Sequence, residues 1–354
     1  MEATYLSESP EATIQLGKKL GARLKSGDVV LLFGELGAGK THFIKGIAEG
    51  LEVSTTVKSP TYAYVNRYDL DEAVFYHYDL YRLGDSVTPT PITTSLSSIG
   101  YNESLDDPKA INVVEWADRL GANLPHSYIK VGIEGGGDVR KIRIEFIDPR
   151  IPNQLVIHQL YEEWATPQHV RAHIKQVSHV AMELAQAFVE KGEIINLNLL
   201  YAASMLHDIS RVCDFITLER DKFQEDITDE KWRKWETCRA QHKGIHHATI
   251  AYEQLAKLGF SEVAEVIRLH RSVNIVDEPD SYDTLEKKIL YYADKRVKHD
   301  EIVDLEERFR DGWERYGQYD DTQTRKRFEQ VEKRTHQLEK ELFKGLGIEP
   351  GDVK

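Results

Sequence analysis

The spacing of hydrophobic residues divides the chain into two parts of different character, with the change near residue 150. Before that point, short apolar runs alternate with segments in which apolar residues recur every three or four positions, as in an α/β domain. From about His169 onward the helical spacing continues with little interruption. The pattern therefore predicts an α/β domain over residues 1–150, a linker over 151–168 and an all-α domain over 169–354.

One strand–turn–helix unit in the first part is sharply defined. Residues 29–33 (VVLLF) predict a buried strand, and residues 41–51 carry apolar side chains at helical spacing. Between them, Gly34–Thr41 (GELGAGKT) matches the pattern G-x-x-x-x-G-K-[ST] without a mismatch. In that pattern the backbone N–H groups and the helix N-terminus face phosphate oxygens. We therefore expect Lys40 to reach the β- and γ-phosphates of a nucleoside triphosphate and Thr41 to reach Mg²⁺, with an ordinary glycine-rich turn as the alternative.

Two acidic residues stand at the ends of strand-like runs in this part. Asp79 ends the run 73–79, and Glu115 follows the run 110–114. A parallel sheet presents such positions at its ligand edge, and ATP hydrolysis needs carboxylates for Mg²⁺ and for the attacking water. On the pattern alone, each acid is equally well an ordinary exposed strand-end residue.

Three further stretches complete the expected layout. Runs at 129–133 and 141–147 flank Gly135–Asp138 and predict a hairpin. The Ser-, Thr- and Pro-rich stretch Asp85–Ile99 predicts a flexible loop. The region from residue 300 to 344 is helical and carries charges of both signs, which is typical of a solvated face.

Composition and charge exclude several functional classes. The formal net charge is −13, and acidic residues are in excess in both halves, so neither half presents a nucleic-acid surface by bulk charge. Two cysteines, Cys213 and Cys238, are too few for a disulfide framework and suit a reducing compartment. The N-terminal segment MEATYLSESPEATIQL lacks a signal-peptide pattern, and no run approaches about 18 apolar residues. We therefore expect a cytoplasmic protein without membrane spans.

The first part resembles a known family. The fragments GDVVLLFGELGAGKTHFIKGIAEGL, VKSPTYAYVNRYDL, YHYDLYRL and NVVEWADRL are similar, in this order, to the TsaE (YjeE) family of small P-loop ATPases over roughly residues 4–147. The resemblance implies binding and hydrolysis of ATP with Mg²⁺ in the threonylcarbamoyl modification of adenosine in tRNA. It also implies a complex with TsaD and TsaB proteins, in which contact with tRNA is indirect.

By position, the resemblance also assigns roles to residues. Thr41 and Glu115 would ligate Mg²⁺, Asp79 would be the acid required for hydrolysis, and Ser59–Thr61 would form a switch-like loop near the γ-phosphate. Trp116 would lie beside the nucleotide, with a core aromatic as the alternative, and Arg140 is a further nucleotide contact. The phosphate contacts would come from Leu36, Gly37, Ala38, Gly39, Lys40 and Thr41. The Asp85–Ile99 stretch departs from the family in being longer and richer in Ser and Thr, which bears on partner docking more than on nucleotide binding.

The helical part places His and Asp residues at the ends of apolar helical runs. His207–Asp208 closes the run 199–206, where two such side chains cost desolvation unless they bind something. A single histidine in such a position is more often a satisfied core residue, but several at successive helix ends favour a divalent metal site. By contrast, His299–Asp300 lies among charged residues and predicts a surface pair. The other candidates are His173, His246, His247, His270 and Asp294.

This order of residues resembles the HD-domain superfamily of metal-dependent phosphohydrolases. The similar fragments are HIKQVSHVAMELA, YAASMLHDISR, HATIAYEQLAKLGF, EVAEVIRLH and LYYADKRV, over about residues 167–300. The resemblance implies that metal-activated water attacks a phosphate-ester small molecule, and that Asp208 also orients that water. Ser210–Arg211 replaces the Gly-Lys of many members, which bears on substrate contacts. By position, His173, His207, Asp208 and Asp294 would hold the first metal (Mg²⁺ or a transition metal), with His247, rather than His246, and His270 at a second.

Together these observations predict an ATPase of the tRNA-modification pathway fused to a helical metal phosphohydrolase. Two alternatives remain open. In one, the first part is an ATP-gated partner switch with little intrinsic turnover. In the other, the second part is a nucleotide phosphatase to which the ATPase is only genetically linked.

Overall fold

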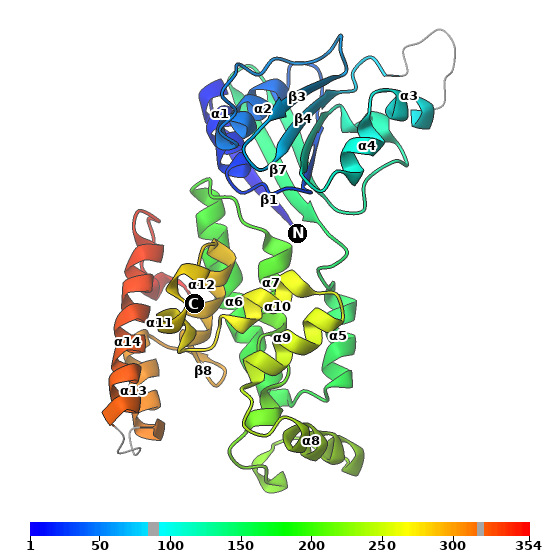
Figure 1. Ribbon diagram of the computed structural model, residues 1–354. Helices are drawn as coiled ribbons and strands as arrows, with labels where there is room; N and C mark the ends of the chain where they lie inside the picture. Colours follow the sequence, from blue (N-terminus) through cyan, green and yellow to red (C-terminus); the bar gives the residue numbers. More distant parts are fainter. Residues whose placement is uncertain (84–91, 317–321) are drawn as a thin grey trace. The chain divides into compact units, whose positions relative to one another are not determined.

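The computed structural model describes residues 1–83, 92–316 and 322–354, which form two compact units. The first unit comprises Met1–Pro149 with Val189–Ile194, and the second comprises Arg150–Phe188 with Ile195–Lys354. The first is a sheet with helices, and the second is helical apart from a two-stranded ribbon (Figure 1). The expected fold class, α/β followed by all-α, is confirmed. No helix in the described ranges is both long and apolar enough to cross a bilayer.

The sheet of the first unit has seven strands in the order β1-β7-β6-β2-β5-β4-β3. β2 lies between β5 and β6 and is parallel to both, β4 is parallel to β5, and β6 and β7 form the expected antiparallel hairpin. The strands are β1 (Glu2–Ser7), β2 (Val29–Phe33), β3 (Val65–Asp69), β4 (Val74–Asp79), β5 (Ala110–Glu115), β6 (Tyr128–Gly136) and β7 (Val139–Ile147). The helices are α1 (Pro10–Gly21), α2 (Lys40–Gly50), α3 (Ile92–Ser98), α4 (Tyr101–Asp106) and the 3-10 turn η1 (Ala117–Leu120).

Helices lie on both sides of this sheet, which explains why β2 is apolar throughout. In Figure 1, α1 and α2 lie to the left of β3 and β4, and α3 and α4 lie to their right. Leu96 of α3 and Tyr101 of α4 belong to the same buried cluster as Leu31 of β2. Because side chains alternate along a strand, Val30 and Leu32 point to the other face, and both are fully buried.

Helices α1 and α2 contact each other through their backbones. A Cβ atom on Gly46 of α2 would lie 2.0 Å from the carbonyl oxygen of Ile14, and one on Gly17 of α1 would lie 2.1 Å from that of Phe43. Only glycine permits such an approach. The close packing fixes α2, whose first turn carries the Gly-Lys-Thr of the phosphate-loop pattern.

The predicted loop over Asp85–Ile99 is corrected in its second half. Residues 92–98 form α3, and Leu96 is buried in the core. The rest of the predicted loop, residues 85–91, lies outside the described residues. Ile92, Leu96 and Ile99 recur at helical spacing, a signal hidden by the surrounding Ser and Thr residues.

The second unit is built from ten α-helices and short 3-10 turns in the described residues. The segment 151–168, predicted as a linker, contains α5, which begins after the cap residue Asn153 and buries Ile157, Leu160 and Tyr161. The long helices are α5 (Gln154–Glu163), α6 (Gln168–Glu190), α7 (Leu197–Leu206), α8 (Asp229–Gln241), α9 (His247–Lys257), α10 (Ser261–Arg268), α12 (Leu285–Lys295), α13 (Leu305–Tyr316) and α14 (Thr322–Phe343). The short elements are α11 (Asn274–Asp277), η2 (Arg211–Asp214), η3 (Arg220–Lys222), η4 (Pro279–Ser281), η5 (Pro350–Asp352) and the ribbon β8 (Val297–Lys298) and β9 (Glu301–Ile302).

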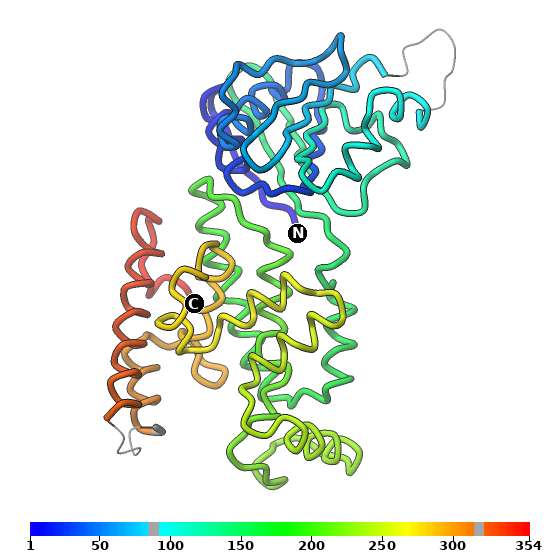
Figure 2. The backbone as a smooth tube through the Cα atoms, in the orientation of Figure 1, coloured from blue at the N-terminus to red at the C-terminus, as the bar shows by residue number. Residues whose placement is uncertain are grey.

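The charged C-terminal region is more than a solvated face. Helices α13 and α14 run side by side (Figure 2), and the Trp313 and Phe328 rings pack 4.4 Å apart. Val331, Leu338 and Leu342 of α14 are buried. Their spacing of seven and four residues gives the helix an apolar stripe that the abundant charges conceal in the sequence.

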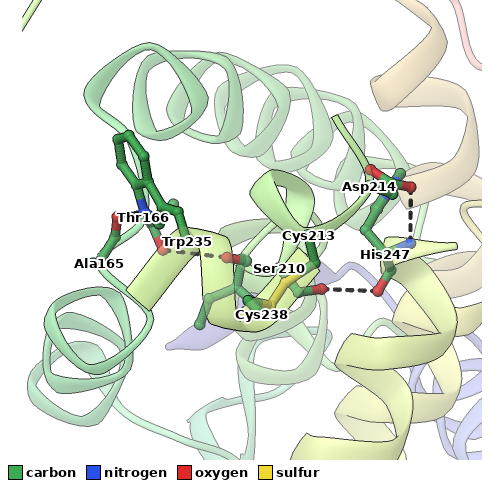
Figure 3. Close-up of a disulfide and its surroundings, with 9 residues drawn as sticks. Ala165, Thr166, Ser210, Cys213, Asp214, Trp235, Cys238 and His247 are labelled. Atoms are coloured by element: carbon green, nitrogen blue, oxygen red, sulfur yellow. Dashed lines mark hydrogen bonds and ion pairs between the residues drawn. A yellow bond between two sulfur atoms is a disulfide. The ribbon is translucent and has the colours of Figure 1, made fainter. Parts of the chain in front are cut away.

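The two cysteines are bonded to each other, a pairing that the sequence analysis did not predict. Cys213 of η2 and Cys238 of α8 form a disulfide with Cα atoms 5.3 Å apart, although 25 residues separate them in the chain (Figure 3). The fold of α8 against η2 brings them together, and the sequence spacing gives no sign of this.

Candidate active sites

The phosphate loop of the first unit joins β2 to α2 and buries its lysine. The Lys40 ammonium donates hydrogen bonds to the carbonyl oxygens of Gly34 (2.7 Å) and Glu35 (2.9 Å). Gly37 and Gly39 have φ angles of +80° and +108°, which favour glycine. Burial lowers the pKa of Lys40. The loop thus combines a curled backbone with a cation that forms no ion pair with a carboxylate in the described ranges of the chain, a combination suited to phosphate groups.

Neighbouring strands bring the predicted acids to one edge of the sheet. The register pairs Asp79 of β4 with Glu115 of β5, and Glu115 with Leu32 of β2. The Thr41 hydroxyl donates to Oε2 of Glu115 at 3.2 Å. The two predicted Mg²⁺ ligands are therefore in contact, and hydroxyl and carboxylate oxygens are donors that fit a hard cation.

Asp79 is bound by the predicted switch loop. Its Oδ2 atom accepts hydrogen bonds from the hydroxyls of Ser59 (2.5 Å) and Thr61 (2.6 Å), and Oδ1 accepts one from the backbone N–H of Tyr81 at 3.0 Å. Asp79 is 3% exposed. Both carboxylate oxygens are thus engaged by protein groups, and release of the loop would free one of them.

Arg140 and Trp116 contact the phosphate loop directly. Arg140 donates from Nε to the carbonyl oxygen of Ala38 at 3.0 Å, and a Cβ atom on Gly39 would lie 2.5 Å from that Nε. The Trp116 ring centroid lies 3.6 Å from Nζ of Lys40, within cation–π range. Arg140 therefore binds the loop backbone, and Trp116 lies against the loop's cation.

In the second unit, the four residues predicted for a first metal come together. Nε2 of His173, on α6, lies 3.3 Å from Oδ1 of Asp294, on α12, and 3.9 Å from Oδ2 of Asp208. Nε2 of His207, which follows α7, lies 3.7 Å from the same Asp294 oxygen. Ligand atoms of His173, His207 and Asp208 all lie within 4.8 Å of one another.

A second group shares Asp208 with the first. Oδ1 of Asp208 lies 2.9 Å from Nε2 of His247 and 3.4 Å from Nε2 of His270, and these two nitrogens are 3.0 Å apart. His246, the less favoured of its pair, instead caps α9 through Nδ1, which accepts from the N–H of Ala248 at 3.1 Å. Asp208 thus stands between two sets of donors, an arrangement able to bridge two cations.

One donor of the cluster, Nε2 of His207, is buried without a hydrogen bond among the described residues, and this fits a bound divalent metal. His207 is fully buried, and its Nδ1 lies 2.8 Å from the carbonyl oxygen of Ser204, which places the ring proton on that nitrogen. Its Nε2 has no hydrogen-bond partner in the described part of the chain. A buried unpaired polar atom costs about 1–3 kcal/mol, and a cation held by imidazole and carboxylate donors would satisfy it.

Charges around the cluster keep its acids ionised. Burial by itself would raise the pKa of Asp208, but the adjacent His247 outweighs it and holds this pKa well below its usual value. Burial also opposes ionisation of Asp294, whose pKa is held down by the ammonium of Lys295 and by hydrogen bonds from His173. Burial lowers the pKa of His270 to about 4, so that its imidazole stays neutral. Neutral imidazoles and ionised carboxylates are the forms that bind metals.

The cluster lies in the wall of a cavity of about 840 Å³. Its wall carries cationic side chains as well as the carboxylates of Asp208, Glu225, Asp294 and Asp300. Among the cations, Nε of Arg308 is buried without a hydrogen-bond partner in the described residues. The other cations of the wall are Arg211, Lys222, Arg271, Lys295 and Lys298, and its phenylalanines are Phe215, Phe309 and Phe328. A cavity of this size and charge suits a small anionic molecule with an apolar portion.

Comparison with known proteins finds a family for each part of the chain. The family model "Threonylcarbamoyl adenosine biosynthesis protein TsaE" matches residues 7–142, and the model "HD domain" matches residues 170–297. The "tRNA threonylcarbamoyladenosine biosynthesis protein TsaE" of Nostoc sp. is 37% identical over 138 residues, which cover 39% of this chain and 81% of that protein. The chain belongs to the TsaE family. Its second half carries an HD domain.

Two further relatives extend this comparison. The TsaE protein of Bacillus subtilis is 35% identical over 130 residues, covering 37% of this chain and 76% of that protein. The solved structure titled "Crystal structure of Bacillus subtilus YdiB" covers 46% of this chain and 96% of its own, at 27% identity and a TM-score of 0.34.

Sequence reasoning missed His77 in the TsaE domain. This side chain is fully buried in β4, and its Nε2 lies 2.9 Å from Oε1 of Glu115. A signal was present, because His77 stands two positions before Asp79 and therefore points to the same face of the strand.

Sequence reasoning also missed Asp214 and Lys295 in the HD domain. Oδ2 of Asp214 lies 2.7 Å from Nδ1 of His247, which leaves Nε2 of that ring facing Asp208. The buried ammonium of Lys295 contacts Asp294 and donates to the carbonyl oxygen of His270 at 3.1 Å. Both residues follow a predicted ligand-bearing segment, but nothing in the spacing separates them from ordinary charged residues.

His299 and Asp300 are both exposed, as predicted for a surface pair, but they also contribute to the site. Both residues line the cavity, and the carbonyl oxygen of His299 lies 2.7 Å from Nδ1 of His173. His299 and Asp300 form the turn between β8 and β9, which brings them to the cavity beside the cluster.

Proposed function

We propose that the TsaE domain binds ATP with Mg²⁺ and hydrolyses it in the threonylcarbamoyl modification of tRNA, together with TsaD- and TsaB-like proteins. The contact between Thr41 and Glu115 at the end of the phosphate loop carries this proposal. The printed names of the relatives point to the same pathway for those proteins. The phosphates would be held by Leu36–Thr41, and Arg140 would hold the loop in place through its hydrogen bond to the carbonyl oxygen of Ala38.

The proposed roles follow from charge and position. Bound Mg²⁺ would neutralise charge on the phosphates. Lys40 would supply the positive charge that its two carbonyl partners leave uncompensated, because neither partner is an anion. Asp79 would act on the attacking water once Ser59 and Thr61 release its carboxylate.

A second candidate, an ATP-gated switch with little intrinsic turnover, is favoured by the same contacts between Asp79 and the switch loop. Turnover of Mg²⁺-ATP by the full-length protein, measured alone and with TsaD- and TsaB-like proteins, separates the two. An ATPase turns over without partners, whereas a switch responds mainly to them. Absence of ATP binding under every condition would refute both.

For the HD domain we propose metal-dependent hydrolysis of a small phosphate ester. The buried Nε2 of His207, which has no hydrogen-bond partner among the described residues, carries this proposal, because it leaves an electron pair close to the carboxylate of Asp294. A bound divalent metal would supply water with a pKa lowered to about 7. Asp208, ionised and placed between the two donor groups, would orient that water, and the cations of the cavity would hold the phosphate.

The test uses the full-length Lys40→Ala protein, so that the TsaE domain contributes little hydrolysis. Metal content is measured after dialysis, and a panel of phosphate esters is screened with Mn²⁺, Ni²⁺ or Mg²⁺. Metal-dependent release of phosphate supports the proposal, and a metal-free protein without activity contradicts it. A preference for nucleotides, unchanged by TsaD- and TsaB-like proteins, would favour the alternative that the two domains are only genetically linked.

A further inference from the structure

The Cys213–Cys238 disulfide lies immediately beside the proposed metal cluster without belonging to it. Cys213 is the third residue of the turn η2, and Cys238 lies in α8, a helix of largely polar composition (Figure 3). The bond therefore joins two elements of the HD domain that are otherwise separate in the chain. What it constrains depends on the contacts of η2.

The turn η2 and the residue before it bind His247 from two sides. The Ser210 hydroxyl donates to the carbonyl oxygen of His247 at 2.8 Å. Asp214, directly after Cys213, accepts from the backbone N–H of His247 at 3.0 Å and contacts its ring Nδ1 at 2.7 Å. Figure 3 shows both Ser210 and Asp214 joined to His247 by dashed lines, with the disulfide nearby. The position and the ring orientation of a proposed metal ligand thus depend on the position of η2.

Helix α8 packs on η2 through a hydrophobic cluster in which Trp235 and Cys238 lie with Val212 and Cys213. Trp235 is its one buried residue, and the indole N–H donates to the carbonyl oxygen of Ala165 at 2.9 Å. Arg239 donates to the carbonyl oxygen of Phe215 at 2.8 Å, just beyond η2. The disulfide adds a covalent tie between this helix and η2 at Cys213, the residue before Asp214, so breaking it removes one constraint on the position of Asp214 relative to His247.

The two sulfurs differ in access. Cys213 is 4% exposed, whereas Cys238 is partly exposed. A small thiolate would therefore attack Sγ of Cys238, forming a mixed disulfide and releasing Cys213 as a thiolate, which takes up a proton. A second thiolate attacks the small molecule's own sulfur and releases Cys238. In sum, the protein disulfide and two small thiols give two protein thiols and one small disulfide.

We propose that Cys213 and Cys238 form a thiol–disulfide exchange site for a low-molecular-weight thiol such as glutathione. The oxidised pair holds Asp214 against His247 and thereby strengthens metal binding by Asp208, His247 and His270. This inference rests on the proposed function of the HD domain, since it assigns redox control to that same cluster. Asp214 is a positioning residue, because it acts on the metal through the His247 ring.

The experiment compares two forms of the full-length protein. One is oxidised with glutathione disulfide and the other reduced with glutathione, each is desalted without air, and both are titrated with Mn²⁺. Thiol labelling verifies the state of the pair. Because loss of an outer partner of a metal-bound histidine typically costs about 10–100-fold in affinity, we expect one class of Mn²⁺ sites to weaken about tenfold on reduction. The class that depends on His173 and His207 should stay unchanged.

Two variants separate the proposed coupling from general effects of reduction. The Cys213→Ser, Cys238→Ser double variant should bind Mn²⁺ as the reduced protein does, in either glutathione buffer. Asp214→Ala should remove the difference between the oxidised and reduced forms while the disulfide still forms. Equal Mn²⁺ affinity of the two forms of the unaltered protein, or failure of the pair to oxidise in glutathione disulfide, overturns the proposal.

A second measurement does not depend on metal. Amide hydrogen exchange at residues 210–214 and at His247 should be faster in the reduced form. If neither form binds Mn²⁺, the proposed hydrolase function fails, and the exchange rates alone decide whether the disulfide controls His247. Identical exchange in both forms would then refute the coupling.

Discussion

Nε2 of His77 lies 2.9 Å from Oε1 of Glu115, and both side chains are buried between β4 and β5. The other oxygen of Glu115 accepts the hydrogen bond from Thr41. The carboxylate proposed to serve Mg²⁺ is therefore fixed from two directions, by a histidine within the sheet and by the first turn of α2.

Replacing His77 by alanine should loosen this carboxylate. We expect a loss of about 1–3 kcal/mol in the free energy of unfolding, because Glu115 loses a buried partner. The Mg²⁺ concentration for half-maximal ATP turnover should also rise. Urea unfolding and Mg²⁺ titration measure the two effects, and His77→Gln, which keeps an N–H donor, should recover part of each. An unchanged Mg²⁺ requirement in a folded His77→Ala protein would mean that His77 only fills space.

Lys40→Ala should weaken binding of Mg²⁺-ATP by about 10–100-fold, since hydrogen bonds to a charged group contribute about 1.5–3 kcal/mol. Turnover should fall with it. Isothermal titration calorimetry measures the affinity. Lys45→Ala, on the exposed side of the same helix, is the matched control and should bind ATP normally. Parental turnover in Lys40→Ala would show that the phosphate-loop assignment is wrong.

Asp79→Ala should separate binding from hydrolysis. The substitution removes the carboxylate that accepts hydrogen bonds from Ser59 and Thr61. ATP affinity should stay within about threefold, because the phosphate loop is unchanged. Turnover should fall about 100-fold or more, which is the range for loss of a catalytic base. Calorimetry and single-turnover phosphate release report the two quantities. If binding and turnover were lost together, a folding role for Asp79 would replace the catalytic one.

Gly46→Ala should destabilise the TsaE domain. The added Cβ would lie 2.0 Å from the carbonyl oxygen of Ile14, so α1 and α2 must move apart. Overpacking of this kind costs about 1–3 kcal/mol, and displacement of α2 should weaken ATP binding as well. Glu49→Ala, at an exposed site of α2, controls for the change in helix composition. Equal thermal stability of Gly46→Ala and the parent would contradict the backbone contact.

His207→Ala should lower the metal content of the HD domain. The substitution removes a buried metal donor whose Nε2 lies 3.7 Å from Oδ1 of Asp294. Elemental analysis of the full-length protein should show fewer metal ions per chain. His179→Ala, on the exposed side of α6, should keep the parental content. The same metal content in His207→Ala would falsify the proposed ligand set.

The sequence alone was sufficient for elements defined by local patterns. The strand over residues 29–33, the helix that follows the phosphate loop and the hairpin near residue 140 are all present, because alternation and helical spacing are local properties of the chain. Likewise, His207–Asp208 stood out because polar residues at the end of a buried helix are costly. The helix α3 was missed because its few apolar residues, such as Leu96, are separated by Ser and Thr residues.

Only the tertiary structure decided which distant residues meet. His77 reaches Glu115, Asp214 reaches His247, and Cys213 reaches Cys238 through packing between separate elements, and no spacing along the chain encodes these pairs. The same holds for His299, which is exposed as its charged neighbours suggested, but whose carbonyl oxygen lies 2.7 Å from Nδ1 of His173. Local periodicity specifies which face of an element is buried, whereas the partner on that face depends on how the elements pack.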